Sequence, residues 1–515
     1  MLLKATGREI TQNKLIYDGC FEHSFENEVI LPDYFPDIMR VVRVDAEQKL
    51  RDTNISGDRV TAEGVTVFRI LYMPSQSEEE EQAPTLKCFT YSVPFEKSGD
   101  IKMGDGAHAN VTLKTQYLSC RILNPRKAAV KATVGICVNV TAPEKVMICD
   151  ALDGVRSDIQ LLTKEISVSS PIASVEKSFK LYEDLEIDSN RPKVAEIISA
   201  SGHAMLTEMK IIANKAVIKG DAYIKLLYMP QDGMVPEPVS YIIPFSQIID
   251  IDGIDDGDAC IMDFTVADII TSLVEGQTEG GRLISAEILL RASANAYRNE
   301  RAEYVADAFS TVFDTAVMTK LCKTETLAHT LDERATVSEK VALNVPQMLA
   351  ILDTAAEPYI KSVARNEKGG ITVNGNIEMS ALVLTSDNGI ENCDRSVPFS
   401  ITLPYNCDRA DIKANITEIN SSVQGDDADM RFSLVLTGAM FTQDQTDMVT
   451  GVEINEAKVK EQAKTSLTVY YPEKNEAVWD IAKRYGVAVE AISTANSIAE
   501  ETVGERKIIL ISRKK

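Results

Sequence analysis

Histidine and cysteine are common metal ligands and catalytic residues, and histidine occurs only 4 times among the 515 residues of this sequence. Cys20 and His23 have the spacing of a pair of zinc ligands. A structural zinc site needs four ligands, and no second pair of this kind follows in the sequence. We therefore expect a partly buried cysteine and histidine at these positions and no bound metal.

The sequence also lacks the short motifs of common catalytic sites. It contains no phosphate-binding G-x-x-x-x-G-K-[ST] loop, no G-x-S-x-G nucleophile turn and no H-E-x-x-H metalloprotease helix. We expect that the protein is not an enzyme and needs no cofactor. A hydrolase hidden in the chain stays open as an alternative, and it would require a cluster of His, Asp and Glu side chains.

Residues suited to binding a partner concentrate near the C-terminus, in the stretch EAVWDIAKRYG. This stretch holds the only tryptophan of the chain, Trp479. A half-exposed tryptophan on a helix is a frequent hot spot for binding a protein, whereas burial in the core is the other interpretation. The candidate partner-binding residues, on this helix and its adjoining loops, are Asn475, Glu476, Trp479, Lys483 and Asn496.

Two helices between two strands are expected to position these side chains. Asn475 is suited to cap the first helix, because its side-chain oxygen can accept a free N–H of the first turn. Glu476 is favourable beside the positive first turn, and Lys483 beside the negative last turn. Gly486 supplies the left-handed residue that ends a helix. The predicted order is a strand at 467–471, the first helix, a second helix at 487–496 and a strand at 506–512.

This order, together with the stretch VWDIAKRYGVAVEAI, resembles the LysM module, a small α+β (βααβ) domain. The resemblance implies binding of N-acetylglucosamine polymers through the loop before the first helix and the loop after the second. Glycan-binding members read Gly-Asp-Thr before the first helix, where this chain has Asn475, Glu476 and Ala477. The resemblance therefore implies a LysM scaffold whose glycan loop has changed, and its ligand is a glycan or a protein.

A long-period repeat occupies the rest of the chain. The stretch FRILYMP at 68–74 returns as IKLLYMP at 224–230. Three more landmarks return in the same order, namely a glycine (Gly64, Gly220, Gly375), the proline of a V/I-P-F motif (Pro94, Pro244, Pro398) and an upstream proline (Pro36, Pro192, Pro346). We infer three copies of one domain, the third the most diverged, at 1–165, 166–318 and 319–452, then a linker at 453–466 and the LysM-like domain at 467–515.

Each copy is predicted to be mainly β. Segments such as VTVFRILY and DAYIKLLY are rich in β-branched and aromatic residues and are apolar on both faces, which is typical of buried strands. The upstream prolines suit the first position of a helix, and Ile38, Val41 and Val42 after the first of them have helical spacing. We expect a multidomain protein of three mainly-β repeats, each a sandwich or open barrel with a short helix.

The composition limits the kinds of partner. Asp and Glu number 77 against 54 Lys and Arg, a net charge of −23, which disfavours binding to nucleic acid or to an anionic membrane surface. No apolar run reaches the roughly 18 residues of a membrane span, and the N-terminus has no secretory signal pattern. The 9 cysteines are scattered and never spaced C-x-x-C, which indicates reduced thiols. We expect a cytoplasmic protein without membrane insertion.

Three β-rich repeats followed by one LysM module resemble the clostridial spore coat morphogenesis proteins that interact with SpoIVA. The resemblance implies a non-enzymatic scaffold of the mother cell, located at the forespore surface in the spore coat. Its LysM-like domain would bind the ATPase of the coat's basement layer, a SpoIVA-like protein. The alternative is a peptidoglycan-binding protein of the cell wall or spore cortex, which would be favoured by export and by an intact glycan loop.

Overall fold

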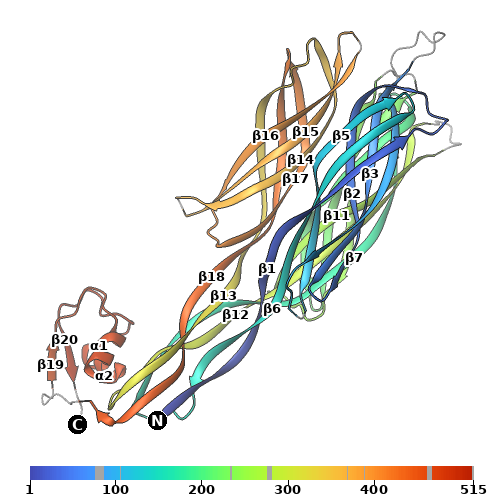
Figure 1. Cartoon of the computed structure of the whole chain (residues 1–515). Helices are drawn as coiled ribbons and strands as arrows, with labels where there is room; N and C mark the ends of the chain where they lie inside the picture. Colours follow the sequence, from blue (N-terminus) through green and yellow to red (C-terminus); the bar gives the residue numbers. More distant parts are fainter. Residues whose placement is uncertain are drawn as a thin grey trace.

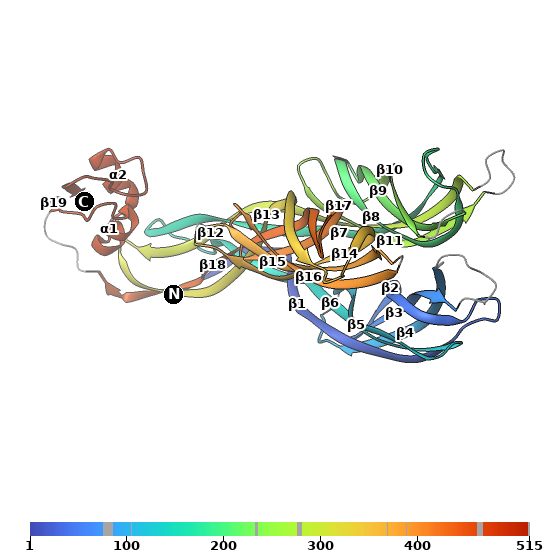
Figure 2. The same ribbon diagram turned by 90° about the horizontal axis from the view of Figure 1, so that it is seen from above.

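The computed structural model describes residues 1–75, 86–104, 106–231, 235–274, 281–367, 369–387, 389–460 and 467–512. Within these ranges the chain is almost entirely β, and both helices lie in the C-terminal part. Figures 1 and 2 show an elongated molecule with β-rich heads at one end. Long strands leave the heads and converge on a stalk, and the C-terminal elements lie beside the end of that stalk.

In the described residues, each of the three repeats contains six strands in the same order. Repeat 1 has β1 (Leu2–Ile30), β2 (Ile38–Ser56), β3 (Arg59–Pro74), β4 (Lys87–Asp100), β5 (His108–Asn124) and β6 (Lys127–Leu152). Repeat 2 has β7 (Ile159–Glu186), β8 (Val194–Ile212), β9 (Lys215–Pro230), β10 (Glu237–Asp250), β11 (Ala259–Leu273) and β12 (Leu283–Ser310). Repeat 3 has β13 (Phe313–Ala342), β14 (Met348–Arg365), β15 (Ile371–Thr385), β16 (Ile390–Leu403), β17 (Arg409–Gln424) and β18 (Asp427–Val459).

The head of each repeat is a sandwich of two antiparallel sheets. In repeat 1 the outer sheet is β1, β6 and β5, and the inner sheet is β2, β3 and β4. The central strand β3 alternates between two environments, since Phe68, Ile70 and Tyr72 pack in the sandwich core while Leu71 and Met73 face the neighbouring repeats. Both faces of this strand are therefore buried, which explains why its sequence is an unbroken apolar run.

The repeated landmarks are parts of two contacts in each head. The hydroxyl of Tyr72 donates to the carbonyl oxygen of Pro36 at 3.0 Å, and Tyr228 makes the same bond to Pro192 at 3.2 Å. Burial raises the pKa of Tyr72 to about 12, so the phenol stays a neutral donor. Repeat 3 has Val383 on the corresponding strand position and lacks this bond, in keeping with its greater divergence.

The glycine and V/I-P-F landmarks meet across the inner sheet. Gly64 lies opposite Phe95 in register, and the equivalent pairs are Gly220 with Phe245 and Gly375 with Phe399. A Cβ atom added to any of these three glycines would collide with the ring of the phenylalanine opposite and with a backbone carbonyl oxygen. The aromatic ring thus covers a bare backbone in every repeat, and the two landmarks are coupled by this contact.

The short helix predicted at the start of each repeat is wrong. Strand β2 begins there, with two β-bulges at Ile38/Arg40 and Val41/Arg43, and register shifts recur at the corresponding places in β8 and β14. A bulge adds one residue to a strand and changes which side chains face inward. Ile38 and Val41 therefore both face the sandwich core although they are three residues apart. Val42 faces the neighbouring repeats, and the resulting spacing imitates a helix.

The three heads pack around a common axis with the inner sheets facing it. One apolar cluster takes the same positions from every repeat, namely Val42, Ile198 and Leu352, then Leu71, Leu227 and Leu382, then Met73, Met229 and Leu384. The fourth strand of each repeat lies against the second strand of the next, so β4 meets β8, β10 meets β14, and β16 meets β2. This arrangement is pseudo-threefold, and it joins repeat 3 back to repeat 1.

A charged layer lies next to this apolar cluster. Arg43 occupies the same repeat position as Ser199 and Asp353, and its guanidinium lies 2.8 Å from the carboxylate of Asp353. Lys225 approaches the same carboxylate at 2.5 Å. The side chains of Arg43 and Asp353 are only 7% and 4% exposed. Each repeat thus contributes a different residue type to the equivalent position, and opposite charges link repeats 1 and 2 to repeat 3.

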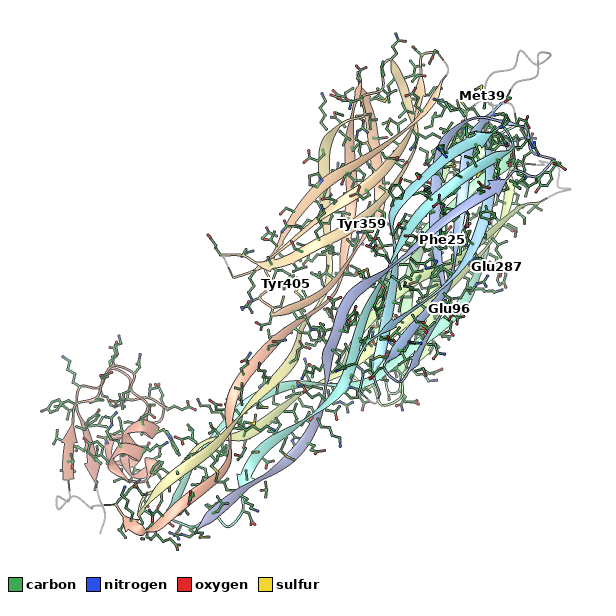
Figure 3. All side chains as sticks on the ribbon, in the orientation of Figure 1. Phe25, Met39, Glu96, Glu287, Tyr359 and Tyr405 are labelled. Carbon is green, nitrogen blue, oxygen red and sulfur yellow. A yellow bond between two sulfur atoms is a disulfide. The ribbon has the colours of Figure 1, made fainter. Side chains whose placement is uncertain are left out.

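Other polar contacts between repeats lie further from the axis. Lys49 of β2 pairs with Asp268 of β11 at 2.5 Å. Tyr359, on β14 of repeat 3 (Figure 3), lies under the ammonium of Lys114 from repeat 1, which is 3.8 Å from its ring centroid. These polar contacts join different repeats and help to fix the orientation of one head relative to the next.

The stalk is built from the long first and last strands of the repeats. Its core again takes equivalent residues from each repeat, with Ile10, Ile166 and Cys322 from the first strands and Ile148, Tyr304 and Met448 from the last. At the far end, Leu2–Lys4 of β1 pair with Gly451–Glu453 of β18, which joins the outer sheets of repeats 1 and 3. The heads and the stalk therefore form one continuous body.

The predicted domain boundaries fall inside strands. The boundary at 165/166 lies within β7 and that at 318/319 within β13. Strand β18 runs to Val459, which pairs with Phe313, so residues 453–459 belong to repeat 3 and the predicted linker is wrong for them. The rest of that linker, 461–466, lies outside the described residues.

The expectation of reduced thiols is wrong for one pair of cysteines. Cys20 of β1 and Cys137 of β6 face each other in register and form a disulfide. Cys20 is therefore not a thiolate ligand beside His23, and the His23 ring packs edge-on against Phe25. The other seven cysteines are free. Burial raises the pKa of the Cys88 thiol to about 12, which keeps it protonated and unreactive.

We predict that Gly220→Ala lowers the free energy of unfolding of the full chain by about 1–3 kcal/mol, because the added methyl group must displace the Phe245 ring. Urea unfolding measures the effect. Gly104→Ala is the matched control, since nothing lies within 4 Å of a Cβ atom there. Equal unfolding midpoints for the two variants would exclude the proposed contact between glycine and phenylalanine.

We predict that Asp353→Asn lowers the free energy of unfolding by about 3 kcal/mol, because it removes the buried carboxylate that Arg43 and Lys225 share near the axis and leaves Arg43 paired with Asp45 alone. Asp100→Asn is the control, since Asp100 pairs with Arg59 at the surface and such pairs contribute about 0–1 kcal/mol. Equal losses in the two variants would show that the axial ion pair is not a special constraint.

This effect should depend on pH. Burial opposes ionisation of Asp353, but Lys225 and Arg43 outweigh it and hold its pKa below the ordinary value of 3.8. A depressed carboxyl pKa stabilises the fold above the ordinary value and loses this contribution as pH falls through the folded-state pKa. The stability difference between wild type and Asp353→Asn should therefore be constant near neutral pH and shrink below about pH 4.

Candidate interaction site

The C-terminal module, residues 467–512, consists of β19 (Leu467–Tyr470), α1 (Val478–Tyr485), α2 (Val489–Asn496) and β20 (Ile509–Ser512). The two strands pair antiparallel, and the two helices pack on them. Its own core is formed by Val478, Ile481, Ala482, Val487, Ile492, Ile498, Val503, Ile509 and Ile511. The periodic apolar positions of both helices account for this packing.

The cap of α1 differs from the predicted one. Ala477 is the N-cap residue and makes no side-chain cap bond. Asn475 lies further back, in a left-handed turn with φ of 59°, and its N–H donates to the carbonyl oxygen of Gly504 at 3.0 Å. The helix ends at Gly486, which has φ of 61° and the left-handed conformation expected of it.

Trp479 belongs to the buried cluster of the module and also contacts strand β12 of repeat 2. Its indole N–H donates to the carboxylate of Asp307 at 2.8 Å. Its ring meets the ring of Phe309 edge to face, with 4.9 Å between centroids. Trp479 is 8% exposed, so it is neither a half-exposed surface residue nor part of a core confined to the module. It is buried at an interface within the chain.

Lys483 lies one turn after Trp479 on the same face of α1. Its ammonium is 2.6 Å and 2.8 Å from the two carboxylate oxygens of Asp307. The carboxylate therefore receives an indole N–H and an ammonium from the module. Charge-assisted hydrogen bonds of this kind are among the stronger ones in proteins.

Repeat 2 presents Asp307 and Phe309 through a local irregularity of β12. The register between β12 and β7 shifts at Val305/Asp307, which is a β-bulge, and the backbone N–H of Ala308 donates to the Asp307 carboxylate at 2.8 Å. Bulges of this kind change the direction of a side chain. Phe309 is fully buried and belongs to the module's core cluster, with Leu162 of β7 packed beside it.

The other three candidate residues do not contact repeat 2. Glu476 accepts hydrogen bonds from the hydroxyl of Tyr470 at 3.0 Å and pairs with Arg484 at 3.2 Å. The side-chain amide of Asn496 donates to the carbonyl oxygens of Ile492 and Leu510, and its oxygen accepts the N–H of Leu510 at 2.6 Å. Asn496 thus ties α2 to β20. The structure brings together only Trp479 and Lys483.

Sequence reasoning missed Asp307 and Phe309, although one signal was present. The corresponding positions are Ala151 and Asp153 in repeat 1 and Gly451 and Glu453 in repeat 3, as the strand registers show. An acid and an aromatic residue two positions apart therefore occur at this place in repeat 2 alone. Such a departure from the repeat marks a place where repeat 2 has a role of its own.

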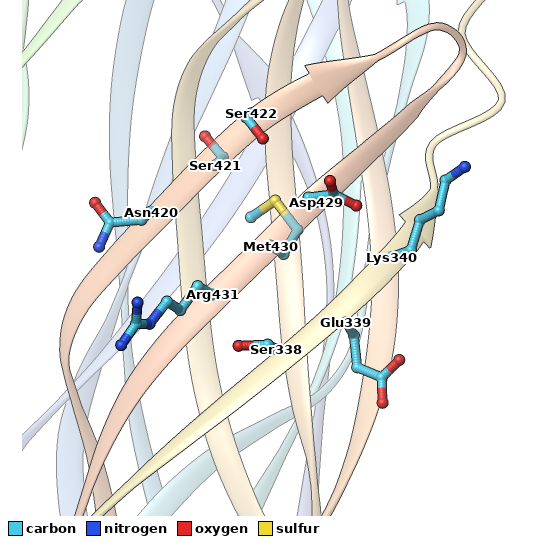
Figure 4. A pocket seen from close by; sticks show the side chains of 9 residues that line it. All are labelled: Ser338, Glu339, Lys340, Asn420, Ser421, Ser422, Asp429, Met430 and Arg431. Atoms are coloured by element: carbon cyan, nitrogen blue, oxygen red, sulfur yellow. The ribbon is translucent and has the colours of Figure 1, made fainter.

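The described residues offer no comparable site elsewhere. A shallow hollow on repeat 3 lies between β13, β17 and β18 (Figure 4) and is lined mostly by exposed polar and charged side chains, among them Glu339, Lys340 and Arg431. Small-molecule sites are usually deep and mostly apolar, so this hollow is a weak candidate. Within the described ranges no three His, Cys, Asp or Glu side chains gather as metal ligands would. Neither helix there is long and apolar enough to span a membrane.

Comparison with known families concerns the heads of the first two repeats. Residues 37–123 and 193–274 match the family model of the SipL SPOCS domain. Repeats 1 and 2 contain SPOCS domains of the SipL family. The matched SPOCS segments correspond to β2–β5 and β8–β11, which include the inner-sheet strands around the axial cluster. The SipL match suggests a spore coat-related protein. No curated protein and no solved structure matches the chain.

We predict that Asn496→Ala acts on stability rather than on partner binding. The variant loses two hydrogen bonds between α2 and β20 and one within α2, so the module should unfold at a lower denaturant concentration, with a loss of about 1–3 kcal/mol. Fluorescence of Trp479 during urea unfolding reports the module directly. Thr494→Ala, at an exposed position of the same helix, is the control. A change confined to partner binding would make Asn496 a contact residue instead.

Proposed function

We propose that the protein is a non-enzymatic scaffold of spore coat assembly, whose C-terminal module binds a SpoIVA-like ATPase of the coat's basement layer at the forespore surface. The match of repeats 1 and 2 to the SipL SPOCS domain carries this proposal. In this proposal the protein acts in the mother cell, and its LysM-like module links it to the ATPase.

The architecture supports a scaffold role. Three heads share one axial core, and their long strands form a stalk that holds the C-terminal module at the end opposite the heads. A molecule of this shape holds several possible binding surfaces at fixed distances from one another. A catalytic function would need a cluster of ionisable side chains, and the proposed scaffold function includes no catalytic residues.

The face of α1 has the chemistry of a protein-binding site. It combines an aromatic ring, an N–H donor and a cation in Trp479 and Lys483, and tryptophan is enriched among the residues that contribute most to binding energy at interfaces. The face already holds a protein segment, since Asp307 and Phe309 of repeat 2 occupy it. A surface that packs against a strand of its own chain can pack against a strand of another protein.

Peptidoglycan binding is the second candidate, and it rests on the LysM resemblance. Two observations count against it. The ring of Trp479 is covered by Phe309 and is not offered to a sugar. The loop before α1 has Asn475 in a left-handed turn, followed by Glu476, which is engaged with Tyr470 and Arg484. A glycan would have to compete with these contacts.

We predict that the full chain binds an immobilised SpoIVA-like ATPase and not purified peptidoglycan. Lys483→Glu should reduce ATPase binding at least 10-fold, because it reverses the charge that faces a partner carboxylate. Lys474→Glu is the control, since Lys474 is an exposed lysine of the same module that pairs with exposed Glu505. Surface plasmon resonance with both variants measures the effect.

The two proposed functions give opposite results in this experiment. Retention on peptidoglycan without binding to the ATPase would contradict the scaffold proposal and favour the cell-wall alternative. Equal losses for Lys483→Glu and Lys474→Glu would contradict the assignment of the partner to this face of α1.

A further inference from the structure

The contact between the C-terminal module and repeat 2 has the form of a recognition site with its ligand in place. The ligand is a short extended segment, Asp307–Ala308–Phe309, at the end of β12. Residues two apart on a strand point to the same side, so the carboxylate and the ring reach the module together. The carboxylate of Asp307 accepts hydrogen bonds from Trp479 and Lys483. The ring of Phe309 packs against Trp479 and the module core.

The aromatic part of this ligand is held as firmly as a core residue. Phe309 is 0% exposed and joins ten buried residues of the module that all follow it in sequence by more than 160 positions, from Val478 to Ile511. Removing it would open a gap in the module's apolar cluster. Asp307 lies at the rim of the same site, with 23% of its side chain exposed. Protein interfaces usually have an apolar core with polar and charged groups at its rim, and this contact has the same arrangement.

We propose that this face of the C-terminal module recognises an extended segment with an aspartate followed two residues later by an aromatic residue, and that Asp307 and Phe309 of repeat 2 occupy the face until a partner with the same chemistry replaces them. The second half of this inference rests on the proposed function. Repeats 1 and 3 lack the pair, so repeat 2 alone supplies the internal ligand.

Competition follows from geometry and covalent connection. Trp479 cannot pack on Phe309 and on a partner's ring at once, so the two occupants exclude each other. The module is joined to β18 through the short segment 461–466, which keeps the internal ligand at a high effective concentration. A partner therefore binds only the fraction of molecules in which the face is free, and its apparent affinity is reduced by that fraction.

The test uses the full chain and begins with docking itself. Treatment with a carbodiimide should join Lys483 to Asp307 directly, since their charged atoms lie 2.6 Å apart, and mass spectrometry identifies the linked peptides. The pair Lys180–Glu287, at 2.5 Å within repeat 2, is the internal control for the reaction. The control link without the Lys483–Asp307 link would overturn the docked arrangement, whatever the protein binds.

The variant Asp307→Asn/Phe309→Leu should free the face. Trp479 is the only tryptophan, so its emission reports this site alone and should shift to longer wavelength as the indole meets water. Asp153→Asn, at the corresponding place in repeat 1, is the matched control and should leave emission unchanged. Lys483→Gln removes only the ion pair with Asp307 and leaves the apolar core of the module intact. A partial shift of Trp479 emission in this variant would therefore reflect release of the face and not unfolding of the module. Unchanged emission in both site variants would overturn the proposal.

Recognition of the segment is tested with a peptide of residues 304–310, YVADAFS, added in excess to the wild-type chain. It should lower the yield of the Lys483–Asp307 link, whereas the peptide with Asn for Asp and Ala for Phe should not. Equal effects of both peptides, or no effect of either, would overturn the assigned chemistry. This result does not depend on the identity of the biological partner.

The regulatory part is tested with the SpoIVA-like ATPase. The freed variant should bind it at least 10-fold more tightly than wild type, because no internal ligand competes. Weaker or equal binding, with docking established by the crosslink, would overturn competition for a shared face while leaving the proposed partner intact. If the ATPase binds no form of the chain, the proposed function is contradicted. The peptide experiment would then be the only test of the recognition chemistry.

Discussion

Burial of equivalent residues from three repeats around one axis is the constraint on which the rest of the structure depends. Each inner sheet has one apolar face against its own outer sheet and another against its neighbours, so a single repeat would expose a large apolar surface. Three copies in one chain bury that surface without an assembly step. The pairing of β1 with β18 closes the arrangement at the stalk, and the ion pair of Arg43 with Asp353 joins repeat 1 to repeat 3 near the axis.

This constraint also explains how differences between the repeats acquire meaning. Positions that share the axial core and the sandwich cores keep their apolar character in all three copies, such as Leu71, Leu227 and Leu382. Positions at the end of the stalk that lie outside its own apolar cluster are free of that requirement. There repeat 2 has the acid and aromatic pair that holds the C-terminal module, through Trp479 and Lys483. A repeated scaffold thus carries one asymmetric site at its end.

Much of the β architecture could be read from the sequence, because strand burial leaves a direct pattern. Tyr72, Gly64 and Phe95 were visible as landmarks, and their contacts explain why they recur together. The predicted helix failed because two bulges in β2 place Ile38 and Val41 on one face with a spacing that helices share. The disulfide of Cys20 with Cys137 could not be inferred, since only the register of β1 and β6 brings two distant cysteines together.

Trp479 was identified as the only tryptophan of the chain and as part of a LysM-like helix, but its partner lies 172 residues away on another domain. No local pattern encodes that contact. Asn475 and Asn496, by contrast, take part in the module's own turns and strand contacts. Sequence reasoning therefore located the module and one side of its interface. The other side required the fold, because it depends on where β12 ends relative to α1.

Hydrogen exchange of the full chain under increasing denaturant tests the shared axial core most directly. If the three heads depend on one cluster, amides of the central strands β3, β9 and β15 should exchange through a common opening, with the same free energy and the same dependence on denaturant. Separate openings, each with its own smaller denaturant dependence, would contradict it and show three domains that are only tethered side by side.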